Sequence, residues 1–154
     1  MPITTDVLLD TNILLRTSFD EQLSLTTASL ACAELLRRGY SLATSISNIA
    51  EFANSATREV GTGNGLGLSV TQAQHRISIF ERHLAIFSES IDSYAGWKNL
   101  VSKYQVRGKQ VHDTRIVSIM LREGVRSILT FNAADFRRFP EIVTLHPDDI
   151  LTKA

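Results

Sequence analysis

The stretch Val7-Leu8-Leu9-Asp10-Thr11-Asn12 decides the fold that we expect for this 154-residue chain. Its first three residues form a short, uninterrupted apolar run, which is typical of a strand covered on both faces. Asp10 follows directly, and a helix is expected to begin at Thr11 or Asn12. Asp10 can cap that helix. It can also face a ligand, because ligands of parallel sheets bind outside the carboxyl ends of the strands.

Strands and helices alternate along the rest of the chain. Apolar runs predict four further strands, at about 40–44, 84–87, 127–130 and 142–145. Helical periodicity predicts helices at about 24–38, 48–58 (capped by Ser47 or Asn48), 70–82, 90–103 and 111–123. Parallel neighbours need crossover connections, so this order predicts an α/β fold, a three-layer α/β/α sandwich around a mostly parallel five-stranded sheet. We expect a single domain over residues 1–154.

Composition and charge exclude several classes of protein. The 16 basic and 16 acidic residues balance, which argues against a general coat for nucleic acid but allows a small basic rim around an acidic pocket. Cys32 is the only cysteine, so an intramolecular disulfide and a thiolate metal site are excluded. Residues 1–6 lack the features of a signal peptide, and no apolar run approaches membrane-spanning length. We therefore expect a protein of the reducing cytoplasm, outside membranes.

Asp113 is the most informative acidic residue. The buried stripe of its predicted helix comprises Ile116, Val117, Ile119 and Met120, and the opposite face carries Arg115, Ser118 and Arg122. Asp113 falls in the middle of the apolar stripe, so its carboxylate faces inward and needs a partner. A favourable interaction with the helix N-terminus contributes at most about 1 kcal/mol, whereas desolvation costs several kcal/mol. The expected partner is a metal ion, or a lysine or arginine from elsewhere.

The remaining acidic and amide candidates are ambiguous by pattern. Glu51 lies off the apolar stripe of its helix and has capping-box spacing with Asn48, which favours a structural role. Asn132 and Asp135 can form a turn. Carboxylates that converge from distant segments repel one another, and a divalent cation relieves that repulsion. A cluster containing Asp10 and Asp113 would therefore point to metal-dependent phosphodiester chemistry.

Several segments together resemble PIN-domain ribonucleases of the VapC-like toxin type, over nearly the whole chain. The matching segments are residues 9–12, 49–52, 111–113 and 128–136, with a closing strand before Pro147. The resemblance implies catalytic roles for Asp10, Glu51, Asp113 and Asp135, and metal contacts from Asp10, Asp113 and Asn132. Asn132 stands where some members have aspartate, so the fourth place of the family's acidic quartet falls on Asn132 or Asp135.

The resemblance also implies an activity, which is cleavage of RNA to leave a 5′ phosphate and a 3′ hydroxyl. Oxygen ligands suit Mg²⁺ or Mn²⁺ rather than zinc, and one or two such ions would activate water and neutralise charge on the leaving oxygen. Thr11, Asn12 and His112 are expected to contact and orient the metal ligands without binding the metal themselves. The basic loop residues that we expect to contact RNA phosphates are Arg107, Lys109, Arg137 and Arg138.

Protein partners follow from the same resemblance, which implies the toxin of a type II toxin–antitoxin pair. Apolar and small residues of the predicted helices at 23–36 and 46–56 could form a groove for an antitoxin helix, whose following arginine would enter the acidic cluster. Tyr94 and Trp97, three residues apart on one helix, favour a core or dimer contact over a platform for base stacking. We expect a homodimer.

Two other classes of protein compete with this interpretation. One is a catalytically silent PIN-like module that binds protein or RNA, in which the carboxylates only cap helices. Metal-dependent nuclease activity separates the two. The other is a phosphoacceptor receiver domain, which requires paired acidic residues after the first strand and a lysine after the last. Asp10 has no acidic neighbour, and no lysine follows residues 142–144.

Overall fold

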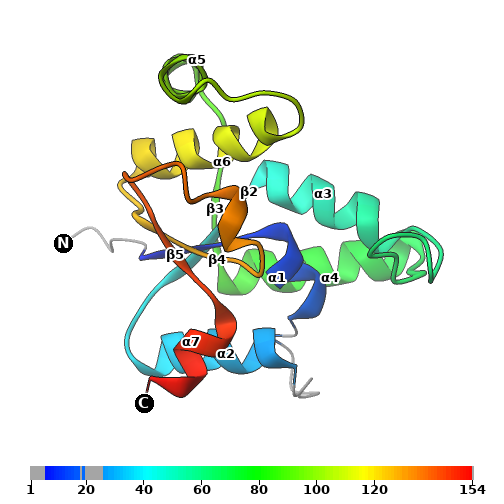
Figure 1. Cartoon of the computed structure of the whole chain (residues 1–154). Coiled ribbons are helices and arrows are strands. Elements are labelled where there is room, and N and C mark those ends of the chain that lie inside the picture. The colour runs from blue at the N-terminus through cyan, green and yellow to red at the C-terminus, as the bar shows by residue number, and fades with distance from the viewer. Residues whose placement is uncertain (1–5, 18, 20–25, 154) are drawn as a thin grey trace.

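The computed structural model describes residues 6–17, 19 and 26–153. Its strands are β1 (Val7–Leu9), β2 (Leu42–Ser45), β3 (Ala85–Phe87), β4 (Ser127–Leu129) and β5 (Val143–Leu145). Its helices are α1 (Thr11–Arg16), α2 (Thr27–Arg37), α3 (Ile46–Ala56), α4 (Val70–His83), α5 (Ile91–Tyr104), α6 (Gln110–Glu123) and α7 (Pro147–Thr152), with a 3₁₀ turn, η1, at Ala133–Asp135 (Figure 1). The first two residues of the helix predicted at 24–38 lie outside the described part of the chain.

The five strands form one parallel sheet in the order β3-β2-β1-β4-β5. The chain builds the sheet from β1 outward to β3, and then returns to the other side of β1 with β4. The strand order therefore reverses between β1 and β4, and the carboxyl ends of these two strands form the switch point at which parallel sheets bind ligands. The predicted α/β fold with a parallel five-stranded sheet is confirmed.

Two apolar layers enclose the sheet. Val7 and Leu9 point into one layer with residues of α1, α2, α3 and α4, including Phe52 and Phe80. Leu8 points into the other layer with residues of α6, because successive side chains of a strand alternate between the two faces. The central strand is thus buried on both sides, as its uninterrupted apolar run predicts. Helices cover both faces of the sheet and complete the α/β/α sandwich.

Helix α6 differs from its prediction on the face away from the sheet. Ser118, expected on the exposed face, is only 3% exposed. Helix α5 packs against that face, on the outer side of α6 (Figure 1). The Ser118 hydroxyl donates to the backbone carbonyl of Ser93, and a Cβ added at Gly96 would lie 2.8 Å from Ser118 Oγ. The spacing of apolar residues could not reveal this burial, because small polar residues that pair across two helices have the same pattern as a solvent-exposed face.

The caps of the first helices along the chain position the site. Asp10 caps α1 and accepts a hydrogen bond from the Thr11 backbone N–H at 2.8 Å, so its structural role is real. The prediction that Ser47 or Asn48 caps α3 is wrong. Ser45 is the cap, and its Oγ accepts from the Asn48 backbone N–H at 3.1 Å. Helix α3 therefore begins directly at the end of β2, which carries Asn48 into the interior.

Candidate active site

An open hollow of about 250 Å³ lies at the switch point of the sheet. It brings together all five of the acidic and amide residues proposed from the sequence, which are Asp10, Glu51, Asp113, Asn132 and Asp135. The other residues that line it are Thr11, Asn12, Leu15, Asn54, Ser55, Arg58 and Asn64. The predicted convergence of distant carboxylates is thus present in the structure. It arises because α1, α3, α6 and η1 all present residues to the same edge of the sheet.

Asp10 is the most firmly held of these residues. It is 8% exposed, and both of its carboxylate oxygens accept hydrogen bonds. Oδ1 accepts from the Thr11 backbone N–H at 2.8 Å and from Asn48 Nδ2 at 3.4 Å. Oδ2 accepts from Thr130 Oγ1 at 2.7 Å and from Asn12 Nδ2 at 3.3 Å. Burial raises the pKa of Asp10, and the bonds from Thr130 and Thr11 act in the opposite direction.

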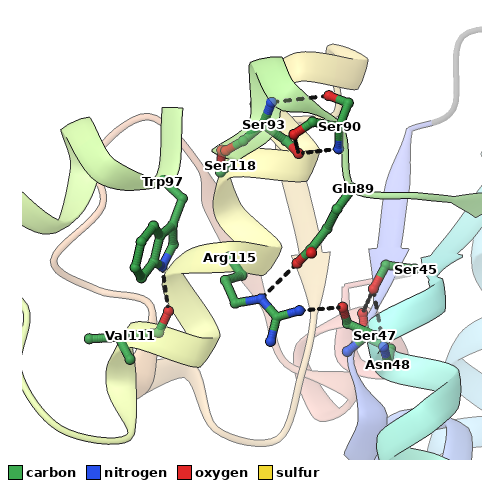
Figure 2. A network of polar contacts seen from close by, with 10 residues as sticks. All are labelled: Ser45, Ser47, Asn48, Glu89, Ser90, Ser93, Trp97, Val111, Arg115 and Ser118. Carbon is green, nitrogen blue, oxygen red and sulfur yellow. Dashed lines mark hydrogen bonds and ion pairs between the residues drawn. The ribbon is translucent and has the colours of Figure 1, made fainter. Parts of the chain in front are cut away.

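Asn48 and Thr130, which the sequence analysis did not select, hold the Asp10 carboxylate. Both are fully buried. Ser45 Oγ donates to Asn48 Oδ1 at 2.6 Å, which turns the Asn48 amide N–H groups toward Asp10 and Thr11. Figure 2 shows the Ser45–Asn48 pair at the start of α3. Thr130 had a signal in the sequence, because it follows its apolar strand as Asp10 follows β1. Asn48 was expected only as a helix cap, since the residues that its amide N–H groups contact, Asp10 and Thr11, come from another segment.

Glu51 reaches the hollow by a contact between helices. The capping-box interpretation of Asn48 and Glu51 is wrong, because Ser45 caps α3 and the Asn48 side chain points inward. Glu51 Oε2 instead accepts a hydrogen bond from Thr11 Oγ1 of α1 at 2.9 Å. Thr11 also accepts from Asn48 Nδ2 at 3.0 Å, so one threonine connects Asn48 to Glu51. Glu51 therefore faces the other carboxylates rather than its own backbone.

Asp113 lies on the first turn of α6 and is half-buried. Burial raises the pKa of its carboxyl to about 7, with further contributions from the negative charges of Asp10, Asp135 and Glu51. Lys109 acts against that rise. Over the described residues, no hydrogen bond or ion pair to the Asp113 side chain is found. The carboxylate therefore has no hydrogen-bonded lysine or arginine partner among the described residues.

Asn132 and Asp135 belong to the turn that follows β4. The Asp135 backbone N–H donates to the Asn132 carbonyl at 3.0 Å, so the predicted turn is present. The Asn132 backbone N–H donates to Thr130 Oγ1 at 3.0 Å, which ties the turn to the residue that holds Asp10. Both side chains line the hollow, and the charge of Asp135 acts on both Asp10 and Asp113. A turn-forming role and a place in the hollow are thus compatible.

The chemistry of the hollow suits a hard divalent cation. Its possible ligands are carboxylate, amide and hydroxyl oxygens, which Mg²⁺ and Mn²⁺ prefer to the nitrogen and sulfur favoured by zinc. Within the described part of the chain, no three His, Cys, Asp or Glu side chains form a preassembled ligand set. Mg²⁺ does not require one, because it usually binds one or two carboxylates and keeps several waters. The residues present fit such an ion.

The basic residues that we expect to contact RNA do not line the acidic hollow itself. Arg107, Lys109 and Arg137 are exposed, and Arg138 donates to Gln110 Oε1. The described residues that line the acidic hollow include none of these four and do include Arg58, at the end of α3. Lys109 still acts electrostatically on Asp113.

Arg58 and His112 flank the acidic hollow on two sides. The glycine-containing loop 61–67 folds back on Arg58, whose carbonyl accepts from the Gly67 backbone N–H at 2.7 Å, and it presents Asn64 to the hollow. No pattern in the sequence singles out Arg58. His112 is exposed and lines an adjoining hollow with Glu51 and Asp113.

The fold and the acidic hollow define a parallel α/β protein with a cluster of carboxylates at the switch point of its sheet. The PIN domain family model matches residues 7–142. The chain belongs to the PIN domain family. No curated protein sequence matches it.

Solved structures of toxins and toxin–antitoxin complexes share this fold. VapBC2 from Rickettsia felis, bound to a promoter DNA fragment, matches with a TM-score of 0.67 and 20% identity over 92% of this chain and 98% of that one. VapBC-1 from nontypeable Haemophilus influenzae matches with a TM-score of 0.66 and 16% identity, over 94% of this chain and 99% of that one. Mycobacterium tuberculosis VapC20, a sarcin–ricin loop cleaving toxin, matches with a TM-score of 0.59 and 14% identity, over 87% of this chain and 95% of that one. The fold is that of VapC toxins.

The raised pKa of Asp113 predicts a pH-dependent stability. Between pH 3.8 and about 7, the folded protein holds the Asp113 proton that the unfolded chain releases, so this residue's contribution to stability falls as pH rises through that window. Without divalent cations, Asp113→Asn should therefore raise the melting temperature at pH 8 by about 2–4 °C, which corresponds to roughly 1 kcal/mol for a domain of this size. The difference should vanish near pH 4. Asp92→Asn, at an exposed aspartate, is the control in calorimetry, and parallel pH profiles for wild type and Asp113→Asn would contradict the prediction.

Proposed function

We propose that this chain is a divalent-metal-dependent endoribonuclease, and that residues 1–154 act as one PIN-like domain. One observation carries the proposal, which is that four carboxylates from four separate elements line a single hollow at the switch point of the sheet. Burial, and then the negative charges of the other three carboxylates, disfavour the ionised form of Asp113 and raise its pKa to about 7. A structure-wide arrangement that concentrates negative charge in this way is suited to binding a cation.

Each residue of the site has a proposed role. Asp10 and Asp113, together with Asn132, would hold Mg²⁺ or Mn²⁺. When bound, the ion supplies Lewis-acid activation of water and neutralises charge on the leaving oxygen. Thr130 and Asn48 keep the Asp10 carboxylate oriented, and Asp113 must lose its proton before it can act as a ligand.

Glu51 and Asp135 complete the catalytic set. The hydrogen bond from Thr11 Oγ1 occupies Glu51 Oε2 and fixes the side chain at the edge of the hollow. From there, Glu51 can accept a proton from the attacking water. Asp135 adds negative charge on the η1 side.

RNA is the proposed substrate. The similar fold of VapC20, which cleaves the sarcin–ricin loop, supports this choice. Arg58 lines the hollow and is the residue best placed to contact a phosphate beside the cleaved bond. Lys109, with Arg107 at the same turn, and the pair Arg137 and Arg138 after η1 would contact phosphates further along the strand.

The silent-module alternative explains only part of the site. Asp10 does cap α1, as that alternative requires. Asp113 caps no helix, because Lys109 occupies the N-cap position of α6 and no side-chain cap bond is made there. A purely structural role therefore leaves the raised pKa of Asp113 without a compensating contact in the described residues.

Activity should depend on the metal and on two carboxylates. The purified protein should cleave RNA with Mg²⁺ or Mn²⁺ and stop when a chelator is added. Asp10→Asn and Asp113→Asn should each lower the rate by roughly 100-fold or more, because each removes charge that stabilises the transition state. Asp148→Asn, at an exposed aspartate of α7, should cleave normally. Cleavage that survives the chelator, or normal rates for both site variants, would disprove the mechanism.

The fourth position can be assigned by metal titration. Asp135 carries charge that acts on Asp10 and Asp113, whereas Asn132 is neutral. We expect Asp135→Asn to raise the metal concentration for half-maximal activity more than Asn132→Ala does. The reverse order would assign the position to Asn132, and two negligible effects would leave a three-carboxylate site.

The proposed partner is a cognate antitoxin. Several solved structures with this fold are VapBC complexes, some of them bound to DNA. On α2, Ala31 and Leu35 face the core, while Leu30 and Leu36 are exposed and available to an amphipathic helix. Leu23, part of the predicted groove, lies outside the described residues.

The proposal includes a homodimer in the cytoplasm. Of the helices that the structure describes, none has the length and apolar character needed to cross a membrane. The only cysteine, Cys32, is buried, and burial raises the pKa of its thiol to about 12. The thiol is therefore protonated and inert at neutral pH, as expected for a residue of the core.

Expression experiments test the partner. Expression of this chain alone should arrest growth, and co-expression of the adjacent reading frame should relieve the arrest by forming a stable complex. Leu30→Glu should weaken co-purification without loss of ribonuclease activity, because it places a charge on the proposed apolar contact while leaving the acidic hollow intact. Tyr40→Ala is a control at an exposed residue beyond the end of α2. A neighbour that never co-purifies would contradict the toxin assignment.

A further inference from the structure

A second hollow, of about 230 Å³, lies between α6, α5 and the loop before α5. Its lining consists of Glu89, Ser93, Tyr94, Trp97 and Arg115, and we call it the aromatic hollow. Figure 2 shows Trp97 beside the start of α6, and Arg115 between Glu89 and Ser47. The proposed catalytic chemistry uses none of these residues.

The aromatic hollow connects to the acidic hollow through shared residues. A middle hollow of about 420 Å³ lies between them. It shares Glu51 and Asp113 with the acidic hollow, and Glu89 and Arg115 with the aromatic hollow. A flexible strand whose phosphate occupies the acidic hollow can therefore continue along the surface to the aromatic hollow.

A hydrogen bond fixes Trp97 in place, and Tyr94 beside it is open to solvent. Trp97 Nε1 donates to the Val111 carbonyl at 2.8 Å, which holds the indole against the first turn of α6. Tyr94 stacks on Trp97, with ring centroids 6.2 Å apart and planes inclined by 23°. Tyr94 is 56% exposed, so the core role that its spacing favoured is excluded for this residue. Rigid, exposed aromatic rings are what proteins use to stack unpaired bases.

Hydrogen-bonding groups lie beside the rings. Arg115 Nε donates to Glu89 Oε1 at 2.6 Å, and Arg115 Nη2 reaches Ser47 Oγ at 3.4 Å. The Arg115 and Glu89 side chains are 41% and 43% exposed, which leaves a guanidinium with further N–H groups and a carboxylate with acceptor capacity at the rim. A nucleobase that rests on the rings would meet both donors and acceptors at its edge.

We infer that the aromatic hollow is a base-binding subsite that holds one unpaired nucleobase of an RNA strand whose phosphate lies in the acidic hollow. This inference rests on the proposed function. The centres of protein interfaces are enriched in Tyr, Trp and Arg but depleted of Lys and Glu. The glutamate and the lysine at this hollow therefore favour RNA over a second copy of this chain. Here Arg115 and Glu89 line the hollow, and Lys98 Nζ lies 5.7 Å from the centroid of Tyr94. The subsite would set sequence preference at one position of the substrate.

Abasic scanning tests the subsite. A short single-stranded RNA with one cleavage site is prepared with an abasic nucleotide at each position in turn. For wild-type protein, one abasic position should raise KM by roughly 5- to 150-fold, the value expected for a lost base–aromatic stack. Tyr94→Ala should show a higher KM for intact RNA and no further penalty at that position. Tyr94→Phe keeps the ring and should retain the penalty, as should Tyr40→Ala at an exposed tyrosine remote from the hollow.

Several results would overturn the subsite. An abasic penalty of equal size in wild type and Tyr94→Ala would do so. So would a change in particle mass for Tyr94→Ala by light scattering, because Tyr94 would then join two copies of the chain.

Failure of the proposed function is separable by a binding measurement. If no RNA is cleaved, fluorescence anisotropy with Asp10→Asn protein compares intact and abasic RNA. A penalty present in Asp10→Asn and absent in Asp10→Asn/Tyr94→Ala would support the subsite without the nuclease, and equal binding of all RNAs would overturn it.

Discussion

The buried carboxylate of Asp10 is the constraint on which the rest of the structure depends. It follows the central strand of the sheet and is only 8% exposed, so hydrogen bonds from the protein must replace most of its hydration. Thr11 and Asn12 supply them from α1, Asn48 from α3 and Thr130 from the end of β4. The same bonds fix how α1, α3 and β4 meet, so one acidic side chain organises the switch point of the sheet.

Negative charge is in excess around Asp10. Asp113, Glu51 and Asp135 surround Asp10, and in the described structure neither Asp113 nor Asp10 forms an ion pair with a basic side chain. Such an arrangement lowers the stability of the folded protein at neutral pH and is typical of functional sites, where pKa values depart furthest from their ordinary range. The family and the fold agree with this interpretation, because the chain is a PIN domain with the fold of VapC toxins.

Helix α6 connects the two proposed parts of the site. Its inner face packs on the sheet, its first turn carries Asp113, and its outer face meets α5 through Ser118 and Gly96. Because α5 lies against that outer face, Tyr94 and Trp97 of α5 line one hollow together with Arg115 of α6. The proposed metal ligand Asp113 and the candidate base-binding surface are thus carried by adjoining parts of the α5–α6 pair.

The sequence by itself determined the order of strands and helices up to β5, the parallel sheet, and the inward direction of Asp113, because these follow from local apolar patterns. It placed Asp10 at the end of the first strand but left open whether that residue caps a helix or faces a ligand, and it did not predict α7. Only the tertiary structure decided the partners. Asn48 and Thr130 hold Asp10, Glu51 pairs with Thr11, and Arg58 lines the hollow. Periodicity reports which face of an element is buried, but it carries no information about which distant element covers that face, and each of these contacts joins segments far apart in the chain.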